Sequence, residues 1–130
     1  MVNFEYKEVY KYLTNICLNL TDDCNLACKY CFVEQHPHYM SLDVAKASID
    51  WVYNNLCIKR SSFKENLPHK NKCTITFFGG EPTIMFDKVI KHLVPYAYNT
   101  YGEENFSFTI TTNGTLLNDD YINFLYNNHI

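Results

Sequence analysis

The chain has 130 residues, 47% of them hydrophobic and 19% charged, and a formal net charge of −3. This length suits one domain with a modest core. The negative net charge argues against general nucleic-acid binding, because proteins that bind nucleic acids in this way usually have a basic surface. No apolar run approaches the roughly 18 residues that span a bilayer, and the N-terminus lacks the apolar core of a signal peptide. We therefore expect a cytoplasmic protein whose partners include neither nucleic acid nor membrane.

The first strand and helix are predicted from the N-terminal half of the chain. Ile16–Leu20 is a short apolar segment that ends at polar residues, and it predicts a strand with Cys17 as a small buried thiol. Ser41 is the expected N-cap of the following helix, and Trp51 is expected to pack against the sheet. The apolar face of this helix is predicted to be Ala45, Ile49, Val52 and Leu56.

The second unit follows a polar, basic stretch, 59–72, which is predicted to be a solvated loop. Cys73–Phe78 is rich in β-branched and aromatic residues and predicts a buried strand. Pro95 is expected to kink the next helix near its C-terminal end, and Gly102 to terminate it. The apolar face of this second helix is predicted to be Phe86, Val89, Ile90, Leu93 and Ala97.

The third unit begins with Phe106–Thr111, which alternates as a strand does. Asn118 is the expected N-cap of a third helix, with acidic residues in its first turn. The apolar side of this helix is predicted to be Ile122, Leu125 and Tyr126.

Strand and helix thus alternate three times, which predicts an α/β fold with a parallel sheet and right-handed crossovers. Such sheets usually have more than three strands, and the chain stops where a fourth would begin. We therefore expect residues 1–130 to be the first half of a larger domain.

Three unusual loops each follow a predicted strand. Because ligand sites in parallel α/β folds lie at the carboxyl ends of the strands, these loops are expected to share one site. The first loop contains Cys24, Cys28 and Cys31, three of the six cysteines of the chain. In a reducing compartment such thiolates suit an iron–sulfur cluster or zinc. A four-iron cluster on three thiolates leaves one iron open; the alternatives are zinc with His36 or His38 as fourth ligand, or three unrelated thiols.

The other two loops have ordinary alternatives. In Gly79-Gly80-Glu81-Pro82, the glycines allow positive φ and close approach to a ligand, and Glu81 can accept from an ammonium group. The alternative is a plain strand-to-helix turn. Thr112-Asn113-Gly114 is by itself a common turn sequence, and its placement beside the other two loops is what suggests function.

The three motifs together resemble the radical S-adenosylmethionine (SAM) superfamily. They read Cys-Asn-Leu-Ala-Cys-Lys-Tyr-Cys over 24–31, Phe-Phe-Gly-Gly-Glu-Pro over 77–82 and Thr-Asn-Gly-Thr over 112–115. The resemblance extends from about residue 16 to the end. It is strongest to the N-terminal half of anaerobic sulfatase maturases and peptide maturases, many of which carry a C-terminal SPASM extension.

The resemblance implies a fold, two cofactors and a reaction. The fold would be three βα units, half of a (βα)6 partial TIM barrel. The three cysteines would hold a [4Fe–4S] cluster, and SAM would chelate its open iron. Cleavage of SAM would give a 5′-deoxyadenosyl radical that takes a hydrogen atom from a peptide or protein substrate. A low-potential donor such as flavodoxin or ferredoxin would supply the electron, and the enzyme would be sensitive to oxygen.

The resemblance also implies the SAM contacts. Gly79, Gly80, Glu81 and Pro82 would surround the methionine amino group, Tyr30 would pack near the adenine, and Thr112 and Asn113 would line the cavity. Sulfatase maturases tend to have a polar residue where Phe78 stands, which favours a peptide maturase. Because half of the barrel is outside this chain, we expect the chain alone to be inactive. The alternatives are a zinc-stabilised binding module and an inactive remnant.

Overall fold

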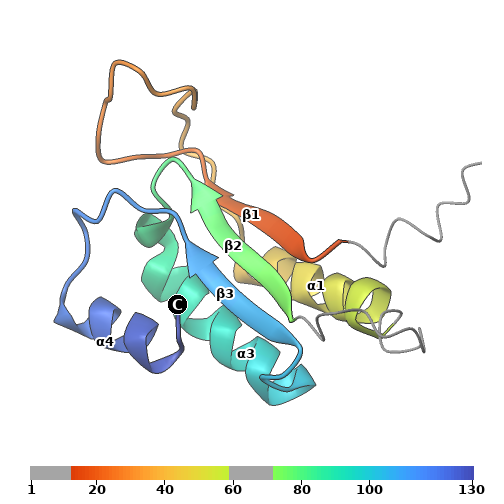
Figure 1. The fold of residues 1–130 in the computed structure, drawn as a ribbon. Coiled ribbons are helices and arrows are strands. Elements are labelled where there is room, and N and C mark those ends of the chain that lie inside the picture. Colours follow the sequence, from red (N-terminus) through yellow and green to blue (C-terminus); the bar gives the residue numbers. More distant parts are fainter. Residues whose placement is uncertain (1–12, 59–71) are drawn as a thin grey trace, which may run out of the picture.

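A computed structural model describes residues 13–58 and 72–130, and it confirms the three βα units. The strands β1 (Asn15–Thr21), β2 (Cys73–Gly79) and β3 (Phe106–Ile110) form one parallel sheet in the order β1-β2-β3 (Figure 1). Almost all of the predicted basic loop at 59–72 lies outside the described residues. The fold is therefore α/β, with three βα units of a parallel-sheet partial TIM barrel.

The helices follow the strands as the sequence predicts. The first is α1 (Leu42–Val52), which continues into the π-helical η2 (Tyr53–Cys57). The second consists of the 3-10 segment η3 (Pro82–Met85), the π-helical η4 (Phe86–Ile90) and α3 (Lys91–Tyr101). The third is α4 (Asp119–Asn127). None of the helices in the described part of the chain has the length and apolarity needed to cross a membrane.

The predicted helix boundaries are confirmed by their capping contacts. The hydroxyl of Ser41 accepts from the Val44 amide at the start of α1, and the Asn118 side chain accepts from the Tyr121 amide at the start of α4. Gly102 ends α3 with a φ of 91°, a conformation that glycine adopts without steric cost. Irregular π-helical turns precede Pro95, which lies inside α3 and cannot donate a backbone hydrogen bond.

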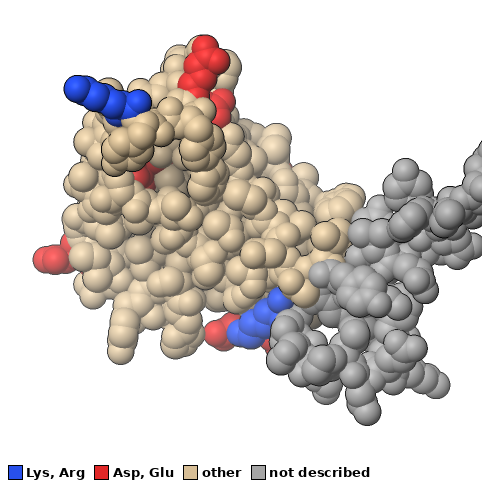
Figure 2. Space-filling view, turned by 45° about the horizontal axis from the view of Figure 1, so that its top comes forward, with Lys and Arg blue, Asp and Glu red and all other residues tan. Residues whose placement is uncertain are grey.

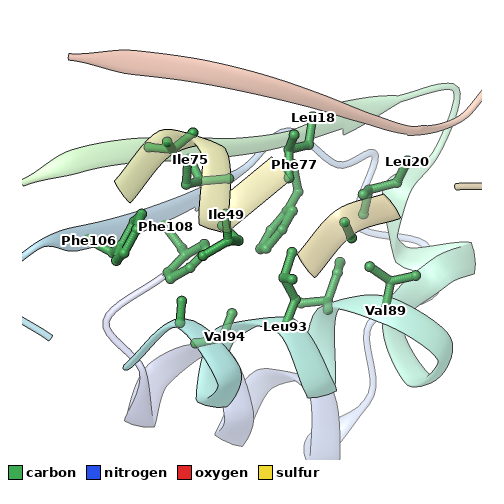
Figure 3. Packing of buried hydrophobic residues seen from close by; sticks show 14 of the residues in the cluster. Leu18, Leu20, Ile49, Ile75, Phe77, Val89, Leu93, Val94, Phe106 and Phe108 are labelled. Atoms are coloured by element: carbon green, nitrogen blue, oxygen red, sulfur yellow. The ribbon is translucent and has the colours of Figure 1, made fainter. Parts of the chain in front are cut away.

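The core lies between one face of the sheet and the helices α1 and α3 (Figure 3). Alternate strand residues point to this face, because successive side chains of a strand point to opposite sides. From the strands these are Leu18, Leu20, Ile75, Phe77, Phe106 and Phe108. The predicted apolar stripes of the first two helices are buried against them, as expected.

The opposite face of the sheet is polar, and this corrects the expectation for Cys17. Leu18 and Leu20 point into the core, so Cys17 points the other way and is exposed. Within the described residues no helix covers this face. Its hydroxyls pair across strands instead, with Thr74 and Ser107 2.9 Å apart between their side-chain oxygens. Strands of parallel sheets are commonly buried on both faces, but among the described residues this face of β1 is open.

Two further predictions about helix faces are wrong. In α4, Ile122 is 50% and Tyr126 80% exposed, and the ring of Tyr121 instead stacks on Phe86 with 3.8 Å between centroids. Trp51 of α1 is 48% exposed, because the buried stripe of that helix leaves it to one side. Both helices do bury an apolar stripe, but neighbouring apolar residues fall outside it.

Candidate active site

The three loops singled out in the sequence lie at the same edge of the sheet (Figure 1). We call residues 22–40 the cysteine loop, residues 79–82 the Gly-Gly turn and residues 111–115 the Asn-Gly turn. They follow β1, β2 and β3 respectively. The topological expectation that they share one edge is thus confirmed, and hydrogen bonds join each loop to the other two.

The Gly-Gly turn packs directly against the backbone at the start of the cysteine loop. The Gly80 amide donates to the Thr21 carbonyl at 2.8 Å, and the Glu81 amide donates to the Asp23 carbonyl at 2.9 Å. A Cβ added to Gly80 would lie 2.3 Å from the Asp23 carbonyl oxygen, and one added to Gly79 would lie 2.1 Å from that of Thr21. The two glycines therefore allow two backbone segments of the chain to approach each other closely. The sequence interpretation had instead expected them to allow close approach of a ligand.

The Glu81 carboxylate joins the Gly-Gly turn to the Asn-Gly turn. Its side chain is 1% exposed. One oxygen, Oε1, accepts from the Thr83 amide (3.0 Å), the Thr83 hydroxyl (2.6 Å) and the Thr112 hydroxyl (2.7 Å). The other, Oε2, accepts from the Asn113 amide at 2.8 Å. A buried carboxylate needs such donors, because an unpaired one is strongly disfavoured.

These donors also set the direction in which the pKa of Glu81 moves. Burial is the largest single influence and by itself raises the pKa of a carboxyl group. The hydrogen bonds from Thr83, Asn113 and Thr112 favour the charged form and together outweigh it, so the pKa of Glu81 lies below its usual value. Glu81 is therefore a carboxylate at neutral pH.

The Asn-Gly turn in turn contacts the cysteine loop. The Asn113 side-chain amide donates to the Asn25 side-chain oxygen at 3.0 Å, and its nitrogen lies 3.9 Å from the Cys24 sulfur. The Asn25 side-chain amide donates to the Thr115 hydroxyl at 2.7 Å. That hydroxyl donates to the Asn113 side-chain oxygen, also at 2.7 Å. Asn25, Thr115 and Asn113 therefore form a closed ring of hydrogen bonds beside Cys24.

The cysteine loop is held at its base by Asp23. Its carboxylate accepts from the Cys24 amide at 2.9 Å and from the Tyr39 hydroxyl at 2.6 Å. The hydrogen bond from Tyr39 to Asp23 raises the pKa of that tyrosine, because the carboxylate favours the protonated phenol. Cys28 and Cys31 are exposed, and Cys24 is partly exposed.

The cysteine loop fits an iron–sulfur cluster by the chemistry of its donors. The Leu26 amide donates to the Cys24 sulfur at 3.4 Å, and N–H donors to sulfur favour the thiolate that a cluster requires. Across the described residues, no three His, Cys, Asp or Glu side chains converge as they would around a single metal ion. His36 lies 3.5 Å from Glu34 and His38 lies 3.5 Å from Asp22, and zinc with either histidine as fourth ligand stays an alternative prediction.

The remaining predicted site residues surround this edge. Tyr30 is 90% exposed on the cysteine loop. Pro82 is buried as the first residue of η3. Phe78, at the end of β2, stacks on Phe32 of the cysteine loop with 6.4 Å between ring centroids. Charged side chains are few and scattered on the face seen in Figure 2. The roles of Tyr30 and Pro82 as SAM contacts stay predictions.

Asn25, Thr83 and Thr115 are the site residues that the sequence interpretation missed. Thr83 directly follows one of the motifs, and Asn25 and Thr115 lie inside the other two. The expected meeting of the three loops at one edge is the signal that could have found them, because polar side chains beside the motifs must then face one another.

The fold and the site define an α/β barrel-type protein with three thiols on the loop after its first strand. A family model described as the radical SAM superfamily matches residues 18–129, and the chain belongs to this superfamily. A cysteine-type anaerobic sulfatase-maturating enzyme of Clostridium novyi is 29% identical over 92% of the chain and 31% of that protein. An S-adenosylmethionine-dependent nucleotide dehydratase of Selenomonas ruminantium is 36% identical over 77% of the chain and 30% of that protein.

A solved structure supports the same assignment. The histidine-tagged protein anSMEcpe with bound AdoMet superposes with a TM-score of 0.58 and 26% identity, over 89% of this chain and 29% of that one. The predicted resemblance is therefore confirmed at the level of the superfamily and its fold. The chain spans about a third of the length of the curated relatives that it matches.

Proposed function

We propose that the protein containing this chain is a radical SAM enzyme that modifies a peptide or protein. The observation that carries the proposal is the joining of three loops at one sheet edge, with Cys24, Cys28 and Cys31 on the first of them. Residues 1–130 would form the N-terminal part of the catalytic domain. The remaining substrate contacts would come from elsewhere in the protein.

In this proposal the cysteine loop holds a [4Fe–4S] cluster through its three thiolates. When bound, such a cluster supplies the electron for reductive cleavage of SAM. The Gly-Gly turn lies beside this loop and offers backbone carbonyls of Gly79 and Gly80 to the methionine amino group. Tyr30 faces the adenine, and Thr112 and Asn113 form part of the cavity wall. A low-potential electron donor such as flavodoxin or ferredoxin completes the system.

The peptide substrate is proposed from the sulfatase-maturating relative and from Phe78. That relative aligns with most of the chain, and its name gives a protein as its substrate class. The stacked pair of Phe78 and Phe32 adds an aromatic wall at the carboxyl end of the open sheet face, suited to an apolar peptide side chain. The nucleotide dehydratase relative makes a nucleotide the competing class.

Metal analysis tests the cluster. We expect the complete protein, reconstituted anaerobically with iron and sulfide, to bind about four irons and four sulfides at this site. Cys24→Ala, Cys28→Ala and Cys31→Ala should each abolish this uptake, because the loop offers only these three thiolates. Cys17→Ala is the matched control, since Cys17 is also exposed but lies on the open sheet face. Stoichiometric zinc without cluster uptake would overturn the proposal.

Substrate-dependent turnover tests the substrate class. Release of 5′-deoxyadenosine by the reduced, reconstituted protein should increase when peptides encoded near its gene are added. Stimulation by nucleotides, with none by peptides, would assign the enzyme to the other class while leaving the cluster intact.

A further inference from the structure

We infer that Asn113 and Glu81 are positioning residues that together hold a side-chain amide on the Cys24 sulfur and so tune the reduction potential of the cluster. This inference rests on the proposed function, because it requires a cluster at Cys24. In this inference the buried carboxylate of Glu81 serves to hold segments of the chain together, and its burial needs no ligand as an explanation.

The hydrogen-bond ring leaves only one orientation for the Asn113 side chain. Its oxygen accepts from the Thr115 amide at 2.9 Å, and a backbone N–H can only donate. The Thr115 hydroxyl donates to the same oxygen. The nitrogen must therefore face Asn25 and Cys24, which places N–H groups toward the sulfur.

Glu81 fixes the backbone from which that side chain projects. Its Oε2 accepts from the Asn113 amide, and its Oε1 accepts from Thr112, one residue earlier. The same Oε1 also accepts from the amide and the hydroxyl of Thr83 at the start of η3. The buried, fully hydrogen-bonded carboxylate of Glu81 thus fixes the position of the Asn-Gly turn relative to the end of β2.

The electrostatic consequence has a definite sign. An N–H group directed at a thiolate stabilises negative charge on the sulfur and on the cluster attached to it. Hydrogen bonds to cluster sulfurs are among the factors that set the reduction potential, and adding negative charge becomes easier when they are present. Removing the side-chain amide of Asn113 should therefore make the cluster harder to reduce, which means a lower reduction potential.

Glu81→Gln is a sharp probe because both carboxylate oxygens accept from a backbone N–H. Gln has one oxygen and one NH2 group. Three donors converge on Oε1 and only the Asn113 amide faces Oε2, so the oxygen is expected at the Oε1 position and the NH2 group opposes the Asn113 amide. The shape of the side chain is kept while one hydrogen bond becomes a donor–donor contact. Glu103→Gln removes the same charge at an exposed position and is the matched control.

The experiment compares reduction potentials of the complete, reconstituted protein by redox titration. We expect Asn113→Ala and Glu81→Gln each to lower the potential by about 59 mV, a tenfold change in a one-electron equilibrium. The double variant should shift no further than either single variant, because both act through one contact. Glu103→Gln should leave the potential unchanged. If Glu81→Gln fails to take up cluster, Asn113→Ala at the exposed turn still decides the outcome.

Amide hydrogen exchange in the cluster-free protein gives an independent readout. Glu81→Gln should speed exchange at Asn113 and Thr115, whereas Asn113→Ala should speed it at Thr115 alone. A full complement of cluster with an unchanged potential in Asn113→Ala would overturn this inference and leave the proposed function standing. Absence of a cluster from the unsubstituted protein would instead overturn the proposed function.

Discussion

Gly80 carries no side chain at the point where the Gly-Gly turn meets the cysteine loop. An alanine there would place its Cβ 2.3 Å from a backbone oxygen that cannot move without shifting the loop. We predict that Gly80→Ala lowers the free energy of unfolding by about 3 kcal/mol, the upper part of the range for overpacking. Urea denaturation measures the loss.

Gly114→Ala is the control for this prediction. Gly114 also needs glycine, but only because its φ is 75°; the nearest atom to an added Cβ is 4.0 Å away. The expected cost is about 1 kcal/mol, that of a left-handed backbone for alanine. Equal losses at the two positions would contradict the view that Gly80 serves close backbone approach.

The hydrogen-bonded carboxylate of Glu81 should make a contribution to stability that is lost in acid. Its pKa in the folded protein lies below the usual value of 4.5, so the unfolded chain binds the proton more tightly. The carboxylate therefore stabilises the fold fully above that value, and the contribution is lost as the pH falls through the lower, folded pKa. Urea midpoints measured from about pH 6 down to pH 3 should fall more steeply for the unsubstituted protein than for Glu81→Gln. Parallel profiles would contradict this.

Helices α1 and α3 are joined by a carboxylate shared between two tyrosines. Asp50 accepts from the hydroxyls of Tyr96 and Tyr101, each at 2.7 Å. The hydrogen bond to Asp50 is the main cause that raises the pKa of Tyr101, with burial adding to it. A raised pKa means that this contribution is fully present below pH 10, the usual tyrosine value, and is lost as the pH rises through the folded pKa.

We therefore predict that stability falls as the pH rises above 10. Tyr101→Phe should start less stable at neutral pH by about 1 kcal/mol, the net value of one hydrogen bond. It should then show a shallower alkaline decline, measured by urea denaturation across that range. An unchanged alkaline slope in Tyr101→Phe would assign the decline to other tyrosines.

The packing of α4 predicts unequal costs for two neighbouring apolar residues. Leu125 is 9% exposed and belongs to the core, whereas Ile122 is 50% exposed. Leu125→Ala should lower the free energy of unfolding by about 2 kcal/mol, at the low end for a buried leucine. Ile122→Ala should change it by less than about 0.5 kcal/mol, as at other surface positions. Similar losses from the two substitutions would show that the helix packs by the stripe first predicted, which included both Ile122 and Leu125.

The order of elements and their caps follow from local patterns, and these were predictable. Ser41, Asn118 and Gly102 mark helix ends because their side chains, or the lack of one, satisfy a local backbone need. Which apolar residue of a helix is buried depends on what stands opposite it. Ile122 and Leu125 are equally apolar in the sequence, so periodicity alone could not separate them.

Over the whole molecule, topology predicted where the site lies, and packing decided how it is built. Parallel strands bring their carboxyl ends to one edge, so the meeting of the three loops was predictable. The contacts between the loops were not, because Asn25 and Asn113 are 88 residues apart and no local pattern links them. The buried position of Glu81 likewise depends on donors from two segments, the start of η3 and the Asn-Gly turn.

The superfamily is assigned to the whole described chain, and the reaction is proposed for the protein that contains it. The proposal places the cluster and part of the SAM site on this chain, which spans about a third of the length of its relatives.

The proposed function requires that a cluster at Cys24, Cys28 and Cys31 has an iron open to SAM. Electron paramagnetic resonance of the reduced, anaerobically reconstituted complete protein tests it most directly. We predict the signal of a reduced [4Fe–4S] cluster that changes when SAM is added, and that is absent from Cys28→Ala. A cluster signal that SAM leaves unchanged would show that no iron of the cluster is open to SAM.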